Sequence, residues 1–191
     1  MKNQTLAENH VEPTTIGGTI ASFFRPFKNN STALYYPGIS NMPEETFEQD
    51  YRRIVAEMQS YAPDLNIETV GITLDRTCAE SRKKDFDKIH VENITQMSID
   101  GILFLPQFSK WLEFSRDKLD PCSQACQYLE LISSGGILFY QLNEDMLMSE
   151  YGINRFIQSL DDRLDGCSIL PVNSKKYGGS LAVKQYKPDK N

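Results

Sequence analysis

The stretch 33–47, which is ALYYPGISNMPEETF, constrains the fold more than any other part of the chain. Residues 33–36 are apolar and aromatic, which predicts a short buried strand. The Pro-Gly pair that follows ends the strand, and Ser40 and Asn41 are favourable caps for a helix at 43–61. Together they predict a strand, a tight loop and a helix, and the free N–H groups at such a helix start suit an anionic group or a sugar.

Strands and helices alternate along the rest of the chain. Apolar runs predict strands at 65–74, 99–106 and 137–140, with short ones near 168–172 and 180–185, and amphipathic patterns predict helices at 86–97, 122–134 and 154–164. This order predicts an α/β fold, a doubly wound parallel sheet of about five strands with helices on both faces. Right-handed crossovers then place the loops after the first and third strands at one edge.

Composition predicts a three-part organisation of the chain. Residues 1–30 are mixed and polar and predict a partly flexible N-terminal extension, 31–166 form the α/β domain, and 167–191 form a C-terminal extension. Within 82–84, three adjacent cations favour either a solvated helix face or a clamp for a phosphate group.

Charge and cysteine usage narrow the class of protein. The 191 residues carry a net charge of −6, which argues against binding to a nucleic-acid polymer or an anionic membrane, and no apolar run is long enough to span a bilayer. Four separated cysteines indicate reduced thiols in a cytoplasmic protein. Cys122 and Cys126 lie one helical turn apart, where packing is favoured over a shared metal because both histidines are distant in sequence. No metal or cofactor is expected.

Two blocks carry a resemblance to a known family. LYYPGISNMPEETF at 34–47 and IDGILFLPQFSKWLEFS at 99–115 are similar to motifs of nucleoside 2-deoxyribosyltransferase-like proteins. In the second block, Asp100 matches the family's aspartate, the Leu-Pro pair follows it, and Trp111 and Ser115 match its tryptophan and serine. The resemblance covers most of the α/β domain and implies a flavodoxin-like sheet.

The resemblance implies chemistry at the N-glycosidic bond of a nucleoside or nucleotide. A carboxylate of the family attacks the anomeric carbon, as a 2-deoxyribosyltransferase or as an N-glycoside hydrolase. The family's glutamate would fall near Cys126 or Gln127, which cannot serve, so Glu130 and Asp120 become the candidate catalytic residues. This departure leaves three functions open: an N-glycosyl enzyme, a non-catalytic nucleotide-binding module on the same fold, or a structural protein.

The expected ligand site lies between the loops 37–41 and 107–120, at the carboxyl ends of the first and third strands. Trp111 either stacks on a base or packs its loop onto the domain. The expected ligand-binding residues are Tyr36, Pro37, Gly38, Ser40, Asn41, Asp100, Gln107, Trp111 and Ser115.

The expected partners follow from the same resemblance. They are a small-molecule nucleoside or nucleotide and further copies of the chain, as a homodimer or larger, because family pockets are commonly completed by a neighbouring subunit. Three phenylalanines at 23–27 also favour burial against such a partner.

Overall fold

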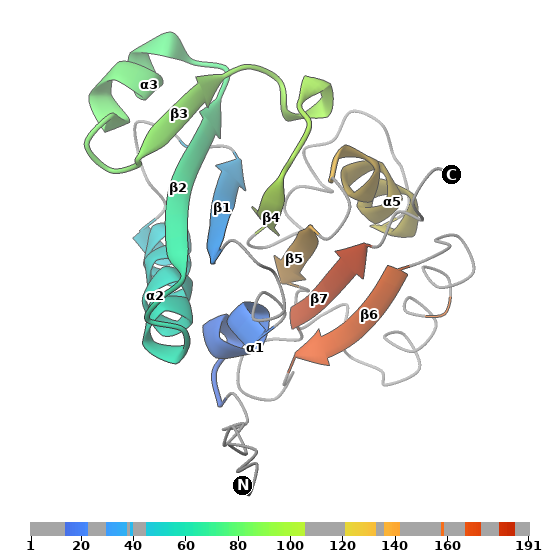
Figure 1. Ribbon diagram of the computed structural model, residues 1–191. Coiled ribbons are helices and arrows are strands. Elements are labelled where there is room, and N and C mark those ends of the chain that lie inside the picture. Colours follow the sequence, from blue (N-terminus) through green and yellow to red (C-terminus); the bar gives the residue numbers. More distant parts are fainter. Residues whose placement is uncertain are drawn as a thin grey trace, which may run out of the picture.

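The structure, a computed structural model, shows a single sheet flanked by helices (Figure 1). It describes residues 14–22, 30–37, 39, 45–105, 121–132, 136–141, 158, 167–172 and 180–185.

Seven strands form the sheet in the order β3-β2-β1-β4-β5-β7-β6. The strands are β1 (Ser31–Pro37), β2 (Asn66–Thr73), β3 (Lys88–Val91), β4 (Gly101–Leu105), β5 (Ile137–Gln141), β6 (Cys167–Val172) and β7 (Ser180–Gln185). β1 to β5 are mutually parallel, whereas β7 runs antiparallel to both of its neighbours, β5 and β6. Figure 1 shows β3 and β6 at the two ends of this row of strands.

The predicted parallel pairing is confirmed. Tyr35 of β1 lies opposite Val70 of β2 on one side and opposite Leu103 of β4 on the other. β4 is buried on both faces, as a continuous apolar run predicts for a parallel sheet, whereas β1 alternates buried and partly buried residues before its end. The flavodoxin-like order, 2-1-3-4-5, is not confirmed, because the first five strands follow the Rossmann order 3-2-1-4-5.

The difference arises at residues 86–97, where the predicted helix is wrong. This segment forms the edge strand β3 and a short 3-10 helix, η1 (Ile94–Gln96). The Asp87 carboxylate accepts hydrogen bonds from the backbone N–H and the hydroxyl of Thr69, at 2.8 and 2.6 Å. These bonds hold the pKa of Asp87 below its usual value and join the start of β3 to β2.

Helices cover both faces of the sheet. The described helices are α1 (Ile16–Ser22), α2 (Glu45–Tyr61), α3 (Arg76–Arg82) and α5 (Pro121–Leu131). α2 joins β1 to β2 and α5 joins β4 to β5, and these two connections run in opposite directions along the sheet. Right-handed crossovers therefore place α2 and α3 on one face and α5 on the other. Among the residues described, no helix is long and apolar enough to cross a membrane.

A cluster of aromatic side chains fills the core beneath α2. Tyr36 lies 5.0 Å from Tyr51 between ring centroids, and Phe104 stacks on Phe139 at 5.3 Å. Phe86, from the segment before β3, packs on Tyr36 and Tyr51. Rings from two helical connections and three strands thus meet at one place, so the packing of α2 depends on the sheet order.

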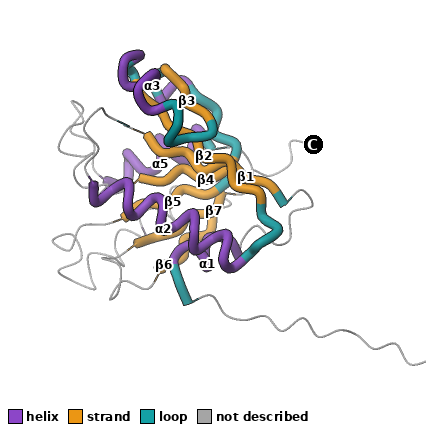
Figure 2. The backbone as a smooth tube through the Cα atoms, turned by 90° about the vertical axis from the view of Figure 1, so that its left-hand side faces the viewer, coloured by secondary structure: helices purple, strands orange, loops and turns teal. Residues whose placement is uncertain are grey.

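α1 packs against α2 within this core, although it lies in the predicted N-terminal extension (Figure 2). The Glu57 carboxylate of α2 accepts a hydrogen bond of 2.9 Å from the Gly17 N–H. A Cβ on Gly17 would lie 2.5 Å from the Ile54 carbonyl oxygen, so a glycine is needed for this close contact. The predicted C-terminal extension likewise contributes β6 and β7 to the sheet.

If α1 is part of the core, truncating its buried side chain destabilises the whole fold. Ile20 is fully buried, so Ile20→Ala is expected to lower the free energy of unfolding by about 2–5 kcal/mol. Urea titration measures this change. Leu74→Ala, at a side chain 74% exposed, is the control and is expected to change it by less than about 0.5 kcal/mol. An Ile20 variant as stable as the control would contradict the packing of α1.

Candidate functional site

The sheet offers one position where ligands of open α/β proteins bind. The connections that leave β1 and β4 run to opposite sides of the sheet, so their carboxyl ends diverge at a topological switch point. A crevice at such a point holds the ligand in this class of fold. The described residues at this edge include the ends of β1 and β4, Ile39 after β1, and the segment after β2.

Asp75 and Glu92 are acidic residues at this edge, two residues after β2 and one residue after β3. Asp75 is the N-cap of α3, where its carboxylate accepts a hydrogen bond of 2.8 Å from the Thr77 N–H. Its own N–H donates to the Thr73 hydroxyl at 3.1 Å. Asp75 is solvent-exposed, and its carboxylate and its backbone N–H each make one of these local hydrogen bonds.

Ile39 connects the loop after β1 to this segment. Its N–H donates to the Ile72 carbonyl at 3.2 Å, and its carbonyl accepts from the Cys78 thiol at 3.4 Å. The loop after β1 and the turn that carries Asp75 are therefore joined by hydrogen bonds.

Two exposed apolar side chains flank Asp75. Leu74, which immediately precedes it, is 74% exposed, and Val91 at the end of β3 is 42% exposed. Val91 lies opposite Thr73 in the register of β3 with β2, and Leu74 follows Thr73. Leu74 and Val91 are therefore at the same edge of the sheet. Large exposed apolar side chains next to a carboxylate suit a ligand with a flat apolar part and hydroxyl groups.

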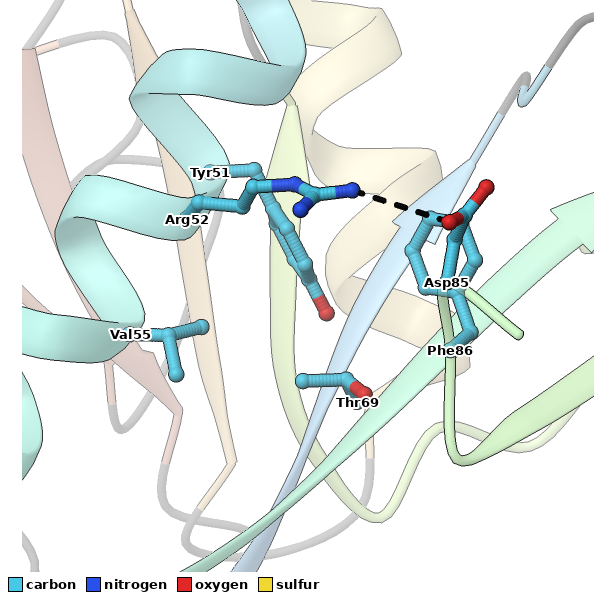
Figure 3. A pocket seen from close by; sticks show the side chains of 6 residues that line it. All are labelled: Tyr51, Arg52, Val55, Thr69, Asp85 and Phe86. Carbon is cyan, nitrogen blue, oxygen red and sulfur yellow. Dashed lines mark ion pairs between the residues drawn. The ribbon is translucent and has the colours of Figure 1, made fainter. Parts of the chain in front are cut away.

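A separate small pocket, of about 140 Å³, opens between α2, β2 and the segment before β3 (Figure 3). Thr69 lies in the middle of β2, so this pocket is away from the carboxyl edge. Figure 3 shows Arg52 extending from α2 towards Asp85, with a closest N–O distance of 3.9 Å. Arg82, which is buried, pairs with the same carboxylate at 2.6 Å.

These ion pairs account for part of the basic run at 82–84. Arg82 binds Asp85 within the protein, and the exposed Lys83 pairs with Glu80 of the same helix at 2.6 Å. The described contacts of Arg82 and Lys83 are thus to carboxylates of the chain, which favours a structural role over a phosphate clamp. Among the described residues, no group of three metal-binding side chains comes together.

The structure places only part of the ligand set predicted from the sequence. Pro37 is the last residue of β1, at the expected edge, whereas the Tyr36 side chain is buried in the aromatic core. Gly38, Ser40, Asn41, Gln107, Trp111, Ser115 and Asp120 lie outside the described residues.

Asp100 and Glu130 lie far from that carboxyl edge of the sheet. Asp100 precedes β4 and so lies at its amino end. Glu130 is exposed near the end of α5, beside Leu131, whose carbonyl accepts a hydrogen bond of 2.7 Å from the Ile99 N–H. The structure therefore does not bring Asp100 or Glu130 together with Pro37.

Asp75 is the residue that reasoning from the sequence missed. Its signal is present, because an acidic residue directly after the second strand of a βαβ unit is where such folds contact a ribose. The prediction for this region rests on the three cations at 82–84, and Asp75 stands before them in the sequence.

Comparison with known proteins identifies the fold. No family model and no curated protein matches the sequence. A crystal structure of the plantazolicin methyltransferase BpumL with a monoazolic desmethylPZN analog and SAH is similar at a TM-score of 0.54, with 9% identity over 88% of this chain and 82% of that chain. BpumL with a pentazolic analog and SAH gives 0.52 at 8% identity, and BpumL with SAH alone gives 0.51 at 9%, each over 88% and 82% of the two chains. At identities this low, the structural similarity shows a shared fold alone, and that fold is Rossmann-like.

These neighbours correct the family suggested by the two sequence blocks. The similar structures are methyltransferases, so the resemblance to nucleoside 2-deoxyribosyltransferase-like proteins is wrong. The functions inferred from this resemblance are wrong as well. They are transferase or hydrolase chemistry at a glycosidic bond, a nucleotide-binding module, and a nucleoside or nucleotide partner. Both blocks contain residues of a strand of the sheet, β1 in the first and β4 in the second, and any doubly wound sheet contains such strands. The single chain gives no support to the predicted homo-oligomer.

Tyr51, which lines the pocket, is expected to stabilise the fold. Its hydroxyl donates 2.9 Å to the Leu34 carbonyl in the core, and burial raises its pKa above the ordinary value of 10. Tyr51→Phe removes this bond and is expected to lower the free energy of unfolding by about 1–2 kcal/mol at pH 7. Because the folded-state pKa is raised, the wild type also loses stability more steeply than the variant above about pH 10.

Urea titrations at pH 7 and above pH 10 measure both effects. Tyr61→Phe, at the half-buried end of the same helix, is the matched control and is expected to change stability less. Equal stability of the wild type and Tyr51→Phe at both pH values would contradict the role of this hydroxyl.

Proposed function

We propose that the protein is a methyltransferase that uses S-adenosylmethionine as the methyl donor. The observation that carries the proposal is Asp75, an exposed carboxylate two residues after the end of β2, which is the strand beside β1. In Rossmann-type sheets an acidic residue at this position accepts hydrogen bonds from the ribose hydroxyls of an adenosine. The similar BpumL structures hold SAH, the demethylated form of this donor.

The edge around Asp75 fits the other parts of an adenosine. Leu74 and Val91 offer apolar surface that suits a base, beside the carboxylate that suits the ribose. The net charge of −6 also favours approach of the donor, which carries a sulfonium cation. The expectation of no cofactor thus gives way to a nucleoside-derived donor at a different edge position from the one predicted.

The loop after β1 departs from the usual dinucleotide-binding fingerprint. Positions 36–41 read YPGISN, so Gly38 is the single glycine where G-x-G-x-x-G has three. In that fingerprint the second glycine lets the backbone approach the ligand closely, and Gly38 stands at the corresponding position of the sequence.

When bound, the donor would supply a methyl group from its sulfonium. The acceptor's lone pair would form a bond to the methyl carbon as the S–C bond breaks, its electron pair would stay on the sulfur of the departing SAH, and the acceptor's proton would pass to solvent. The chain is then required mainly to hold donor and acceptor in line. Asp75 anchors the ribose, Leu74 and Val91 border the base, and the loop through Ile39 borders the rest of the donor. In this proposal the described residues bind the donor and orient it.

Asp75→Asn is the variant that tests the proposal. Asparagine caps a helix as well as aspartate does, so α3 is expected to keep its start and the fold its stability. The loss of a charged acceptor is expected to weaken SAH binding tenfold or more, about 1.4 kcal/mol or above. Isothermal titration calorimetry with SAH and with S-adenosylmethionine measures the affinity.

Asp64→Asn is the matched control, because Asp64 is also exposed but lies before β2, at the opposite edge. It is expected to bind SAH like the wild type. A wild-type protein that binds neither compound would overturn the proposed function, and an unchanged affinity of Asp75→Asn would remove Asp75 from the site.

A further inference from the structure

We infer that Ile39 is a positioning residue, whose contacts with β2 and α3 hold the end of β1 in register with Asp75 and thereby set the affinity of the donor site. The ligand in this inference rests on the proposed function. The geometry rests on the backbone and side-chain contacts of Ile39, which is 4% exposed.

Both backbone polar groups of Ile39 bind the segment from β2 to α3. Its N–H donates to the Ile72 carbonyl at 3.2 Å, which continues the pairing of β1 with β2 beyond Pro37. Its carbonyl accepts from the Cys78 thiol at 3.4 Å. The Ile39 backbone is therefore held by β2 and α3.

The Ile39 side chain occupies space that a glycine in β2 leaves open. A Cβ on Gly71 would lie 3.0 Å from Ile39 Cδ1 and 3.2 Å from Phe86 Cδ2. Gly71 faces the same side of the sheet as Tyr36, its partner in the register, so Ile39 borders the aromatic core. Any larger residue at 71 pushes on Ile39, on Phe86 or on both.

Cys78 links this contact to the carboxylate. It lies in the first turn of α3 and is 1% exposed, and the same turn is capped by Asp75 through the Thr77 N–H. The loop carbonyl and the carboxylate are thus attached to one helical turn. A ligand that contacts both requires their separation to be kept, and displacements of about 1 Å are enough to weaken such sites.

Three variants test Ile39 through its neighbours. Cys78→Ala removes the donor to the loop, Cys78→Ser restores a donor, and Gly71→Ala crowds the side chain from the sheet. Cys126→Ala, on α5, is the matched control, because it removes a partly buried thiol from the opposite face of the sheet. The readouts are hydrogen exchange of the Ile39 amide, SAH affinity by calorimetry, and melting temperature.

The inference predicts that Cys78→Ala and Gly71→Ala speed exchange of the Ile39 amide tenfold or more and weaken SAH binding fivefold or more. Cys78→Ser is expected to restore both, even where its melting temperature stays as low as that of Cys78→Ala. A merely structural role would instead lower melting temperature in all of the variants, with exchange and affinity like those of Cys126→Ala, and this result overturns the inference.

Hydrogen exchange separates this inference from the proposed function. If the wild type binds no SAH but exchange at Ile39 responds as expected, the positioning of the loop stands and the proposed donor is wrong. If SAH binds and neither exchange nor affinity responds, the positioning role is wrong and the proposed function stands.

Discussion

The pairing of β1 with β4 is the interaction on which the rest of the structure depends. Gly101 starts β4 opposite Ala33, with a φ of 149° that side-chain-bearing residues rarely adopt. A Cβ there would lie 2.3 Å from the Ala33 carbonyl oxygen, so only glycine allows this approach. The two halves of the sheet join where β1 pairs with β4. The connections that follow these two strands run to opposite sides of the sheet, and this divergence creates the edge where Asp75 and Ile39 lie.

Much of the fold could be predicted because burial on both faces leaves a plain record in sequence. The run at 99–106 is apolar almost throughout, and it became β4 in the predicted parallel register. β3 could not be found in this way, because it is a four-residue edge strand with partly exposed side chains. Phe86 and Ile89 lie three residues apart, which mimics a helical face, although Phe86 packs in the aromatic core before the strand begins.

The site was harder to predict than the sheet, because its determinants are contacts between loops. Strand alternation indicates where parallel strands end and so places Pro37 at the carboxyl edge, while the ligand site expected there stays a prediction. Because β3 was not predicted, the residues that flank the end of β2, Asp75 among them, were not recognised as part of this edge. Ile39 gave no signal, because an isoleucine in a loop shows its role only through the hydrogen bonds to Ile72 and Cys78.

The central claim is that the carboxyl edge beside Asp75 holds an adenosine. A crystal structure of the full chain with SAH tests it most directly. The account predicts that the ribose hydroxyls lie about 3 Å from the Asp75 carboxylate oxygens, with the base against Leu74 and Val91. SAH bound elsewhere, such as in the pocket that Tyr51 and Arg52 border, or a ribose without contact to Asp75, would contradict it.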